Sequence, residues 1–281
     1  MAILQSLHLY PIKSCAGIAL SEARLGHAGL ESQGVGDREW MLVEAGSGEF
    51  VTQRSTPRMA LIVPALAAGA LAVRAPGQAD LAVPLPLAGR QPERQVTVWG
   101  HACRAFDEGD AAAAWFSAFL GRALRLVRFD PAHRRASSAQ WTGETEALNR
   151  FSDGFPILLI SQASLDDLNA RLAQAGRAAL PMNRFRPNLV LGAVGPYEED
   201  HLQALRADGL ELRPVKPCPR CPVPSIEQSS GEFGPDPLDI LAQYRADART
   251  GGVVFGQNVI AVHGQGQTLR AGQVFEPEWN F

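Results

Sequence analysis

Short stretches in which apolar and polar residues alternate dominate the first hundred positions of the chain. The clearest stretches are residues 3–10, 18–25, 40–43 and 81–83, and Gly, Pro and Ser residues separate them. Alternation with a period of two is the pattern of a β-strand that buries one face. Many short strands at this spacing predict a β-barrel or a compact sandwich.

A helical pattern first appears after residue 109. Asp110 can cap a helix in which the four apolar residues between positions 115 and 120 share one face. Gly121 is placed to end this helix, because glycine adopts the left-handed conformation at low cost. We expect a second module to begin soon afterwards, which divides the chain into residues 1–125 and 126–281.

The second half of the chain combines strand and helix patterns. Residues 155–160 predict a buried strand, and the next helix is expected to begin at a capping box of Ser164 and Asp167. Residues 132–146 are polar and without periodicity, which predicts a surface loop or a lid. Further strands are expected at 188–191, 209–215 and 259–263, and a short helix at 236–244.

Composition and charge narrow the class of protein. Of the 281 residues, 46% are hydrophobic, which is enough for a sizeable core, and the net charge of −3 disfavours general binding to nucleic acid or anionic membranes. The first ten residues lack the features of a secretory signal, and Pro64 and Gly69 interrupt the longest apolar run. Four cysteines do not form a secreted disulfide framework. We therefore expect a cytoplasmic protein with neither nucleic acid nor a membrane as partner.

The segment Lys216-Pro217-Cys218-Pro219-Arg220-Cys221 places two thiols, a guanidinium and an ammonium within six residues. Prolines fix φ and lack an N–H donor, so we expect this segment to be a stiff loop rather than a helix or strand. A thiol beside Arg220 and Lys216 is biased toward the thiolate, which attacks electrophiles and binds soft metals.

A structural zinc site and a redox pair are disfavoured roles for these two cysteines, but both stay open. A structural zinc site usually needs four ligands, and the remaining thiols, Cys15 and Cys103, lie far away in sequence, with no His pair at ligand spacing. A thioredoxin-like redox pair normally opens a helix, whereas Pro222 and Pro224 follow this pair.

Five further segments share a pattern with a known family. They are YPIKSCAG at 10–17, GDREW at 36–40, TQR at 52–54, NRFRPN at 183–188 and FGQN at 255–258. In this order, and together with residues 216–221, they resemble the MOSC family over nearly the whole chain. The resemblance implies a β-rich α/β fold, with a MOSC N-terminal β-barrel-like module at 1–125 and a mixed β-barrel MOSC domain with peripheral helices at 126–281.

Within that superfamily the chain resembles the YcbX-like proteins and the mitochondrial amidoxime-reducing component, which carry a molybdenum cofactor (Mo-molybdopterin). In that family the second cysteine of the loop binds molybdenum, which places the metal-ligand and catalytic roles on Cys221 and leaves Cys218 structural. A soft thiolate suits a molybdenum centre with a dithiolene. Pyridoxal phosphate binding is associated with the superfamily only, and nothing in this chain adds to it.

The cofactor ends in a phosphate, which proteins hold with Arg forks, Lys charges and backbone donors. A single arginine is explained equally well by a surface ion pair, but several basic residues in matched motifs favour the cofactor. The residues that the resemblance nominates for this group are Lys13, Ser14, Arg38, Arg186 and Arg220.

The remaining cofactor-binding candidates also have simpler structural roles available to them. Ser161 and Ser164 stand at an expected helix start, where free N–H groups can receive an anion, although capping alone explains Ser164. A loop cap or a turn between strands would equally account for Asn188, Phe255, Gly256, Gln257 and Asn258.

The resemblance implies a molybdenum-dependent oxidoreductase that reduces small N-hydroxylated substrates. The sequence has no four-cysteine cluster motif and no G-x-G-x-x-G fingerprint, so a separate ferredoxin- or cytochrome-like protein is expected to supply the electrons. A persulfide carrier at Cys221 and a cofactor storage or delivery protein are the alternatives. Pro219 and residues 224–227 depart from the family pattern, which leaves the shape of the pocket and the substrate open.

Overall fold

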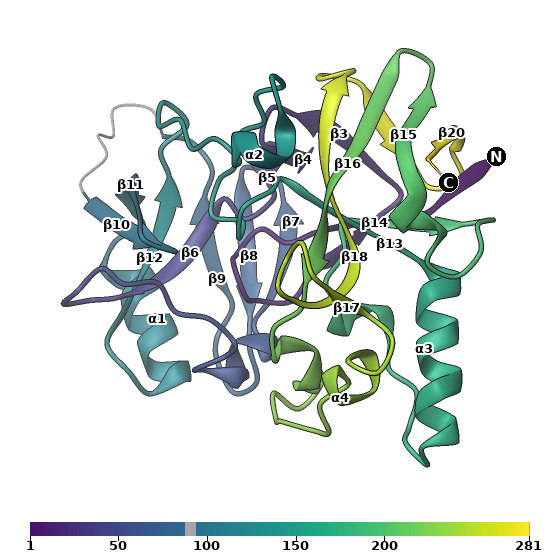
Figure 1. Cartoon of the computed structure of the whole chain (residues 1–281). Coiled ribbons are helices and arrows are strands. Elements are labelled where there is room, and N and C mark those ends of the chain that lie inside the picture. The colour runs from purple at the N-terminus through teal and green to yellow at the C-terminus, as the bar shows by residue number, and fades with distance from the viewer. Residues whose placement is uncertain (88–93, 281) are drawn as a thin grey trace.

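The computed structural model of the chain describes residues 1–87 and 94–280, and its centre is a closed β-barrel (Figure 1). The seven barrel strands follow the spatial order β13, β14, β1, β20, β15, β16 and β18, and β18 pairs again with β13. The β13–β14 pair is parallel and the other pairs are antiparallel, so the barrel is mixed. Their bounds are β1 Ala2–Leu9, β13 Ile157–Ser161, β14 Leu189–Gly192, β15 Leu202–Ala207, β16 Leu210–Pro219, β18 Gly252–His263 and β20 Val274–Trp279.

Three smaller sheets form the rest of the β-structure, and β2 (Ile18–Leu20) and β17 (Ala246–Asp247) extend the barrel sheet. One sheet has the order β10, β11, β12 and β6, with bounds Arg94–Val98, His101–Asp107, Leu124–Phe129 and Trp40–Glu44. The second has the order β19, β3, β4 and β5, with bounds Thr268–Arg270, Glu22–Gly26, Gly29–Ser32 and Val35–Gly36. The third has the order β7, β8 and β9, with bounds Val63–Ala67, Ala70–Arg74 and Leu81–Pro84.

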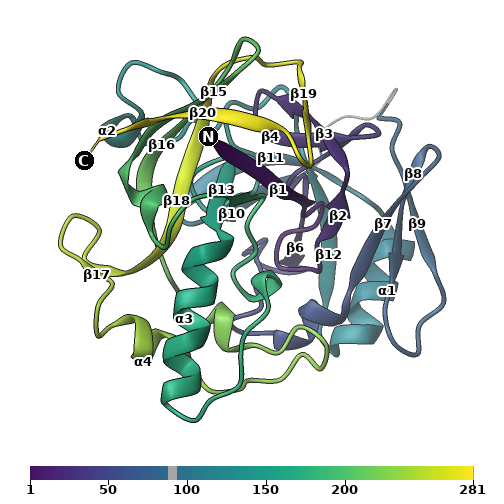
Figure 2. The ribbon, with the colours of Figure 1, turned by 90° about the vertical axis from the view of Figure 1, so that its right-hand side faces the viewer.

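The helices are few and peripheral. Helix α3 (Gln162–Gln174) lies along the outside of the barrel, and α1 (Asp110–Leu120) packs on the sheet that contains β12 (Figure 2). The short helices are α2 (Ala139–Thr142), α4 (Leu238–Leu241), η1 (Pro57–Leu61), η2 (Met182–Arg184), η3 (Glu198–His201) and η4 (Val223–Ser225). Among the residues described, no helix has both the length and the apolar character that crossing a membrane requires.

The largest cluster of buried side chains joins the two halves of the chain. It runs from Leu7 of β1 through Trp40 of β6 and Phe116 of α1 to Phe275 of β20. In β1 the buried positions change phase at the register shift between Leu4 and Ser6. Strand β1 therefore belongs to the barrel of the second half, although the expected division at residue 125 assigns it to the first.

The expected strands at 3–10, 40–43, 81–83 and 155–160 and the helices after 109 and 161 are confirmed as elements, with shifted ends. Gly109 rather than Asp110 is the N-cap of α1, and Gly121 ends it in the left-handed conformation, as expected. The N-cap of α3 is Ser161, whose hydroxyl accepts from the Ser164 N–H at 3.0 Å. The capping box expected at Ser164 was therefore placed three residues too late.

The structure changes three expectations about loops, of which the first was wrong. Residues 216–219 continue β16, because register shifts between Pro214 and Lys216 and between Pro217 and Pro219 create bulges where a missing N–H is tolerated. Residues 255–258 lie inside β18 rather than in a turn. Within 132–146, the chain forms α2 and buries Arg135 and Ser137, so this segment is partly packed.

The pairing of β18 with β13 requires a glycine at position 256, because the two strands are very close there. This position therefore provides a test of barrel closure. Gly256 has φ +81°, and an added Cβ would lie 2.5 Å from Ile160 Cγ1 and 2.7 Å from the Leu159 carbonyl oxygen. We predict that Gly256→Ala lowers the free energy of unfolding by about 3 kcal/mol or more, as a sum of backbone strain and overpacking. Gly251→Ala is the matched control, because Gly251 shares a positive φ but has open space around it. Equal urea midpoints for the two variants would contradict this role of Gly256.

Candidate functional site

A cavity lies where loops of the first half meet the barrel end formed by β16 and β18. The cavity and the open solvent at its mouth together contain about 890 Å³ of empty space. Its lining comes from within residues 13–14, 52–54, 152–155, 185–188 and 218–223, together with Arg38, Leu158 and Asn258. The two halves of the chain therefore build the cavity together.

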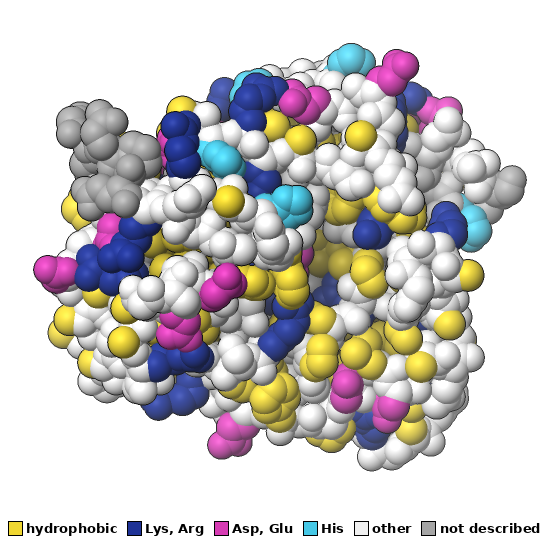
Figure 3. Space-filling view, turned by 60° about the vertical axis from the view of Figure 1, so that its left-hand side comes forward, with side chains coloured by type: hydrophobic (Ala, Val, Ile, Leu, Met, Phe, Trp, Pro, Cys, Tyr) yellow, Lys and Arg dark blue, Asp and Glu magenta, His cyan; other side chains and the backbone are white. Residues whose placement is uncertain are grey.

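Positive charge dominates this lining. Five basic side chains and one carboxylate, that of Asp153, line the cavity among the residues that the structure describes. On the molecular face drawn in Figure 3, basic, acidic and apolar side chains are interspersed instead. A partly enclosed pocket of one sign focuses its field, so the cavity favours an anionic ligand. The basic side chains are Lys13, Arg38, Arg54, Arg186 and Arg220.

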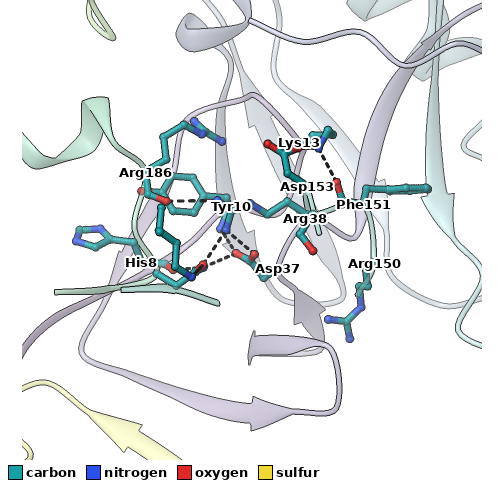
Figure 4. A network of polar contacts seen from close by, with 12 residues as sticks. His8, Tyr10, Lys13, Asp37, Arg38, Arg150, Phe151, Asp153 and Arg186 are labelled. Carbon is teal, nitrogen blue, oxygen red and sulfur yellow. Dashed lines mark hydrogen bonds and ion pairs between the residues drawn. The ribbon is translucent and has the colours of Figure 1, made fainter. Parts of the chain in front are cut away.

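Arg38 is fixed by a buried polar network (Figure 4). Its Nη1 forms an ion pair with Asp37 and donates to Asn188 Oδ1 at 3.1 Å, while its Nη2 donates to the Arg186 carbonyl at 3.3 Å. Asn188 Nδ2 in turn donates to Asp37 Oδ1 at 2.9 Å. Asn188 thereby connects the segment after residue 183 to the loop that precedes β6.

Two other cavity arginines have buried nitrogens without a partner. Arg186 Nη1 donates to the Cys15 carbonyl at 2.6 Å, but its Nη2 has no partner. Arg220 Nη2 donates to the Phe185 carbonyl at 2.9 Å, but its Nε has none. Burial lowers the pKa of Arg186 to about 10, and the Arg38 guanidinium adds to this shift. An anion bound beside these guanidinium groups would offset the electrostatic penalty of burying them.

The backbone is strained at three positions in this lining. Ser14, Arg38 and Arg186 have φ values of 67°, 45° and 58°, in the left-handed region that non-glycine residues avoid. They are three of the eight non-glycine residues with positive φ in the described part of the chain. Strain of this kind concentrates at ligand-binding positions, where the surrounding structure maintains it.

An ion pair stands at the mouth of the cavity. Lys13 is buried, and its Nζ donates to the Phe151 carbonyl at 2.7 Å and pairs with Asp153, whose side chain is 64% exposed. Trp99 Nε1 also donates to Asp153, at 2.9 Å. Although desolvation opposes ionisation, the Lys13 ammonium holds the pKa of Asp153 below its usual range. Desolvation in turn lowers the pKa of Lys13.

Both cysteines of the 216–221 segment line the cavity, but the expected electrostatics hold poorly for Cys218. Burial raises the pKa of the Cys218 thiol, against the opposing effect of Arg220, whose Nη1 lies 3.3 Å from Cys218 Sγ. The Lys216 ammonium lies 5.1 Å from the centroid of the Trp141 ring and does not line the cavity. Cys221 is half-buried and belongs to the lining.

Protein side chains alone do not build a metal site here. Within residues 1–87 and 94–280, no group of three or more His, Cys, Asp or Glu side chains could hold a metal ion. A metal at Cys221 would therefore need most of its ligands from a bound cofactor. The cationic lining and the partnerless guanidine nitrogens fit a cofactor that carries a phosphate.

The structure brings most of the candidate site residues together. Those that line the cavity are Lys13, Ser14, Arg38, Arg186, Asn188, Arg220, Cys221 and Asn258. Residues 52–54 also line it; their TQR motif contributed to the resemblance without being assigned a role. Asp153 was missed as well, because no local pattern around it signals a contact with Lys13, 140 residues away.

Five candidates lie outside the cavity, which corrects their expected placement. Ser161 and Ser164 are fully buried, and their polar groups serve Glu199, which accepts from the Ser161 N–H at 3.1 Å and from Ser164 Oγ at 2.8 Å. No anion is needed to explain this helix start. The other three, on β18, are Phe255, Gly256 and Gln257.

Side-chain alternation along β18 explains the placement of Phe255 and Gln257, and Gly256 has no side chain to reach the cavity. Asn258 reaches the cavity, whereas Gln257 donates to Asp200 Oδ1 at 2.6 Å on the other side of the strand. Phe255 packs on the cavity residue Phe185 with ring centroids 4.6 Å apart, so it supports the wall from behind.

Comparison with known proteins agrees with this architecture. The chain matches the MOSC N-terminal beta barrel domain over residues 1–123 and the MOSC domain over residues 147–276. It is 35% identical to mitochondrial amidoxime-reducing component 1 of Mus musculus over 243 residues, which cover 85% of this chain and 70% of that protein. The chain belongs to the MOSC family.

Other relatives of this MOSC protein carry the same name or a different one. The human mitochondrial amidoxime-reducing component 1 is 33% identical, over 85% of this chain and 71% of that protein. A molybdenum cofactor sulfurase of Oryza sativa subsp. japonica is 33% identical over 90% of this chain, but over 32% of its own length. None of these names mentions pyridoxal phosphate, and the cytoplasmic location stays a prediction.

We predict that inorganic phosphate stabilises the cofactor-free MOSC protein against heat. Saturation at 100 times the dissociation constant corresponds to about 2.7 kcal/mol. Arg186→Ala should weaken phosphate binding by about 1.5 kcal/mol or more, because it removes a charge-assisted contact. Arg249→Ala is the control, since Arg249 is 67% exposed and pairs with Asp247 away from the cavity. Equal phosphate titrations for the two variants, read by thermal unfolding, would contradict an anion site at Arg186.

We also predict that Cys218 reacts slowly with iodoacetamide at neutral pH. The thiolate is the reactive form, and burial raises the Cys218 pKa above its ordinary value of about 8.5. Alkylation in a Cys221→Ser background should therefore increase only as the pH rises through that higher pKa, and any stability that this thiol contributes should be lost over the same range. Site-resolved mass spectrometry between pH 7 and pH 10 measures the profile. An inflection below the ordinary value would show that Arg220 outweighs burial.

Proposed function

We propose that this MOSC protein is a molybdenum-cofactor-dependent oxidoreductase that reduces N-hydroxylated compounds. The observation that carries the proposal is one cavity that combines the Cys221 thiol with partnerless, buried nitrogens of Arg186 and Arg220. A thiolate is a suitable ligand for a soft metal, and the guanidinium groups suit a phosphate. The names of the relatives, amidoxime-reducing components and a molybdenum cofactor sulfurase, support the same cofactor.

Different residues of the cavity would bind different parts of the cofactor. Cys221 would bind the metal, and Arg38, Arg186 and Arg220 would hold the anionic end. Lys13, Ser14, Asn188 and Asn258 complete the proposed cofactor-binding set. When bound, the cofactor would supply the two-electron redox chemistry, and the protein supplies position and electrostatics. Ser161, Ser164, Phe255, Gly256 and Gln257 are left out, because they do not reach the cavity.

The overall reaction consumes electrons and protons that must enter the cavity. For a hydroxylamine, R–NHOH + 2e⁻ + 2H⁺ gives R–NH₂ + H₂O, so the N–O bond breaks and its oxygen leaves as water. The Asp153 side chain is 64% exposed, so its ionised carboxylate is an acceptor that can orient a polar substrate. A separate electron-transfer protein is proposed to deliver the electrons.

A persulfide carrier is the alternative that a specific observation favours. Cys221 lines an anion-suited cavity, and one relative is named a molybdenum cofactor sulfurase. In that case the Cys221 thiolate would take the outer sulfur of a persulfide on a donor protein, whose S–S bond breaks to release the donor thiolate, and the cavity would bind the cofactor only as the next acceptor. Cofactor storage or delivery without turnover is the remaining alternative.

Production of the full chain in a host that makes the cofactor tests the proposal. We predict about one molybdenum atom per chain, as expected for a single thiolate-anchored centre. A viologen reduced by dithionite should drive reduction of an N-hydroxylated substrate, whereas NADH alone should not. Cys221→Ala should abolish turnover, and Cys218→Ala, which changes the neighbouring thiol near the end of β16, should retain bound metal.

Three results would separate the alternatives. Absent molybdenum together with a persulfide on Cys221 would favour the sulfur carrier. Bound molybdenum without turnover of any N-hydroxylated compound would favour storage or delivery. Metal loss in Cys218→Ala with retention in Cys221→Ala would show that the two thiol roles are interchanged.

A further inference from the structure

The ring of Tyr10 contacts two of the cavity arginines at once (Figure 4). The guanidinium carbons of Arg38 and Arg186 lie 4.3 Å and 4.4 Å from its ring centroid. Tyr10 is 2% exposed and follows directly after β1, so it is a rigid part of the barrel end. These two contacts are close enough for strong cation–π attraction, particularly where water is excluded.

Several contacts fix the position of this ring. The Tyr10 N–H donates to Asp37 Oδ1 at 2.9 Å, and the Arg38 N–H donates to the Tyr10 carbonyl at 2.7 Å. A Cβ added to Gly17 would lie 2.5 Å from Tyr10 Cε1, so the ring lies directly against the Gly17 backbone. Any side chain at position 17 would displace the ring from this place.

An aromatic ring and a carboxylate differ in whether they occupy the N–H donors of a guanidinium that they contact. A carboxylate would neutralise a guanidinium and occupy its N–H donors, whereas a ring attracts the charge and leaves the donors in the guanidinium plane free. Arg186 Nη2 is such a donor, since it is buried and has no partner. Asp37 pairs with Arg38, yet among the described residues Arg186 has no carboxylate as a partner of its side chain.

The arrangement is costly without a ligand. Arg38 and Arg186 repel each other, which contributes to the lowered pKa of Arg186, and both residues have positive φ. Packing alone would be served by an apolar pair at lower cost. The arrangement is explained if the two like charges serve an anionic ligand.

We propose that Tyr10 is a positioning residue, whose ring holds the guanidinium groups of Arg38 and Arg186 in place and leaves Arg186 Nη2 as a donor for a phosphate group. This inference rests on the proposed function, because the phosphate would be that of the bound cofactor. The proposed role does not depend on a hydrogen bond from the Tyr10 hydroxyl. The ring, rather than the hydroxyl, is the required part.

Phosphate binding by the cofactor-free full chain tests this role with a readout other than activity. Tyr10→Phe should bind inorganic phosphate as the unmodified chain does, because the ring is retained. Tyr10→Leu should weaken the dissociation constant about tenfold, as expected for the loss of partly buried cation–π contacts. Isothermal titration gives the constants, and molybdenum content after production in a cofactor-competent host gives a second readout that should follow the same order.

Tyr244→Leu is the matched control, because Tyr244 stacks on Arg171 at 4.0 Å outside the cavity. It removes the same kind of contact and should leave phosphate affinity unchanged. If Tyr10→Leu does not fold, Gly17→Ala displaces the ring while keeping the tyrosine, and it should weaken phosphate binding in the same way. Rescue by Tyr10→Phe excludes a role of the hydroxyl.

The failure of this inference can be distinguished from failure of the proposed function. Equal phosphate affinity and molybdenum content in the unmodified chain and Tyr10→Leu would overturn the positioning role and leave the cofactor assignment standing. Weakened binding in Tyr10→Phe as well would assign the effect to the hydroxyl and also overturn it. No molybdenum in the unmodified chain, with tight phosphate binding that Tyr10→Leu weakens, would overturn the proposed cofactor and keep Tyr10 as an anion-site residue.

Discussion

Concentration of positive charge in a cavity with little opposing carboxylate is the constraint on which this site depends. Burial of a cation is unfavourable, and it lowers the pKa of both Lys13, in spite of its ion pair with Asp153, and Arg186. Carbonyl oxygens partly offset the cost: that of Phe151 accepts from Lys13, that of Cys15 from Arg186 and that of Phe185 from Arg220. Partial charges orient the cations without neutralising them, so the cavity keeps its attraction for an anion.

Barrel closure explains how distant segments meet around this charge. Strand β1 lies between β14 and β20, so the loop that follows β1 is held at the same end of the barrel as the segment before β14. The contact between Arg186 and the Cys15 carbonyl joins positions 171 residues apart. A division of the chain near residue 125 separates the sequence motifs, but the folded site depends on strands from both sides of it.

Sequence patterns predicted the elements that have a strong local signal. Alternation located β1 and β6, and apolar periodicity with Gly121 located α1. The resemblance located the lining arginines and Cys221, because its motifs occupy the loops at the barrel end. Burial and long-range contacts decided the rest, since Ser161 and Ser164 are satisfied by Glu199, which is 35 or more residues away. The bulges that let β16 continue through its prolines are likewise set by pairing with β18.

The two cysteines show why sequence proximity alone does not assign chemistry. Both stand near Arg220, yet burial outweighs its charge at Cys218 and keeps that thiol protonated, in the form that packs rather than reacts. The same principle applies to the arginines, because the contribution of each one to ligand binding depends on which of its N–H donors have no partner in the protein. A neutral ligand of similar shape would bring no negative charge to Arg186 Nη2 and Arg220 Nε. Its binding would therefore offset less of the free-energy cost of the buried cations and the strained backbone than an anion would. Selectivity for an anion therefore follows from how the protein holds Arg186, which a carbonyl and an aromatic ring contact in place of a carboxylate.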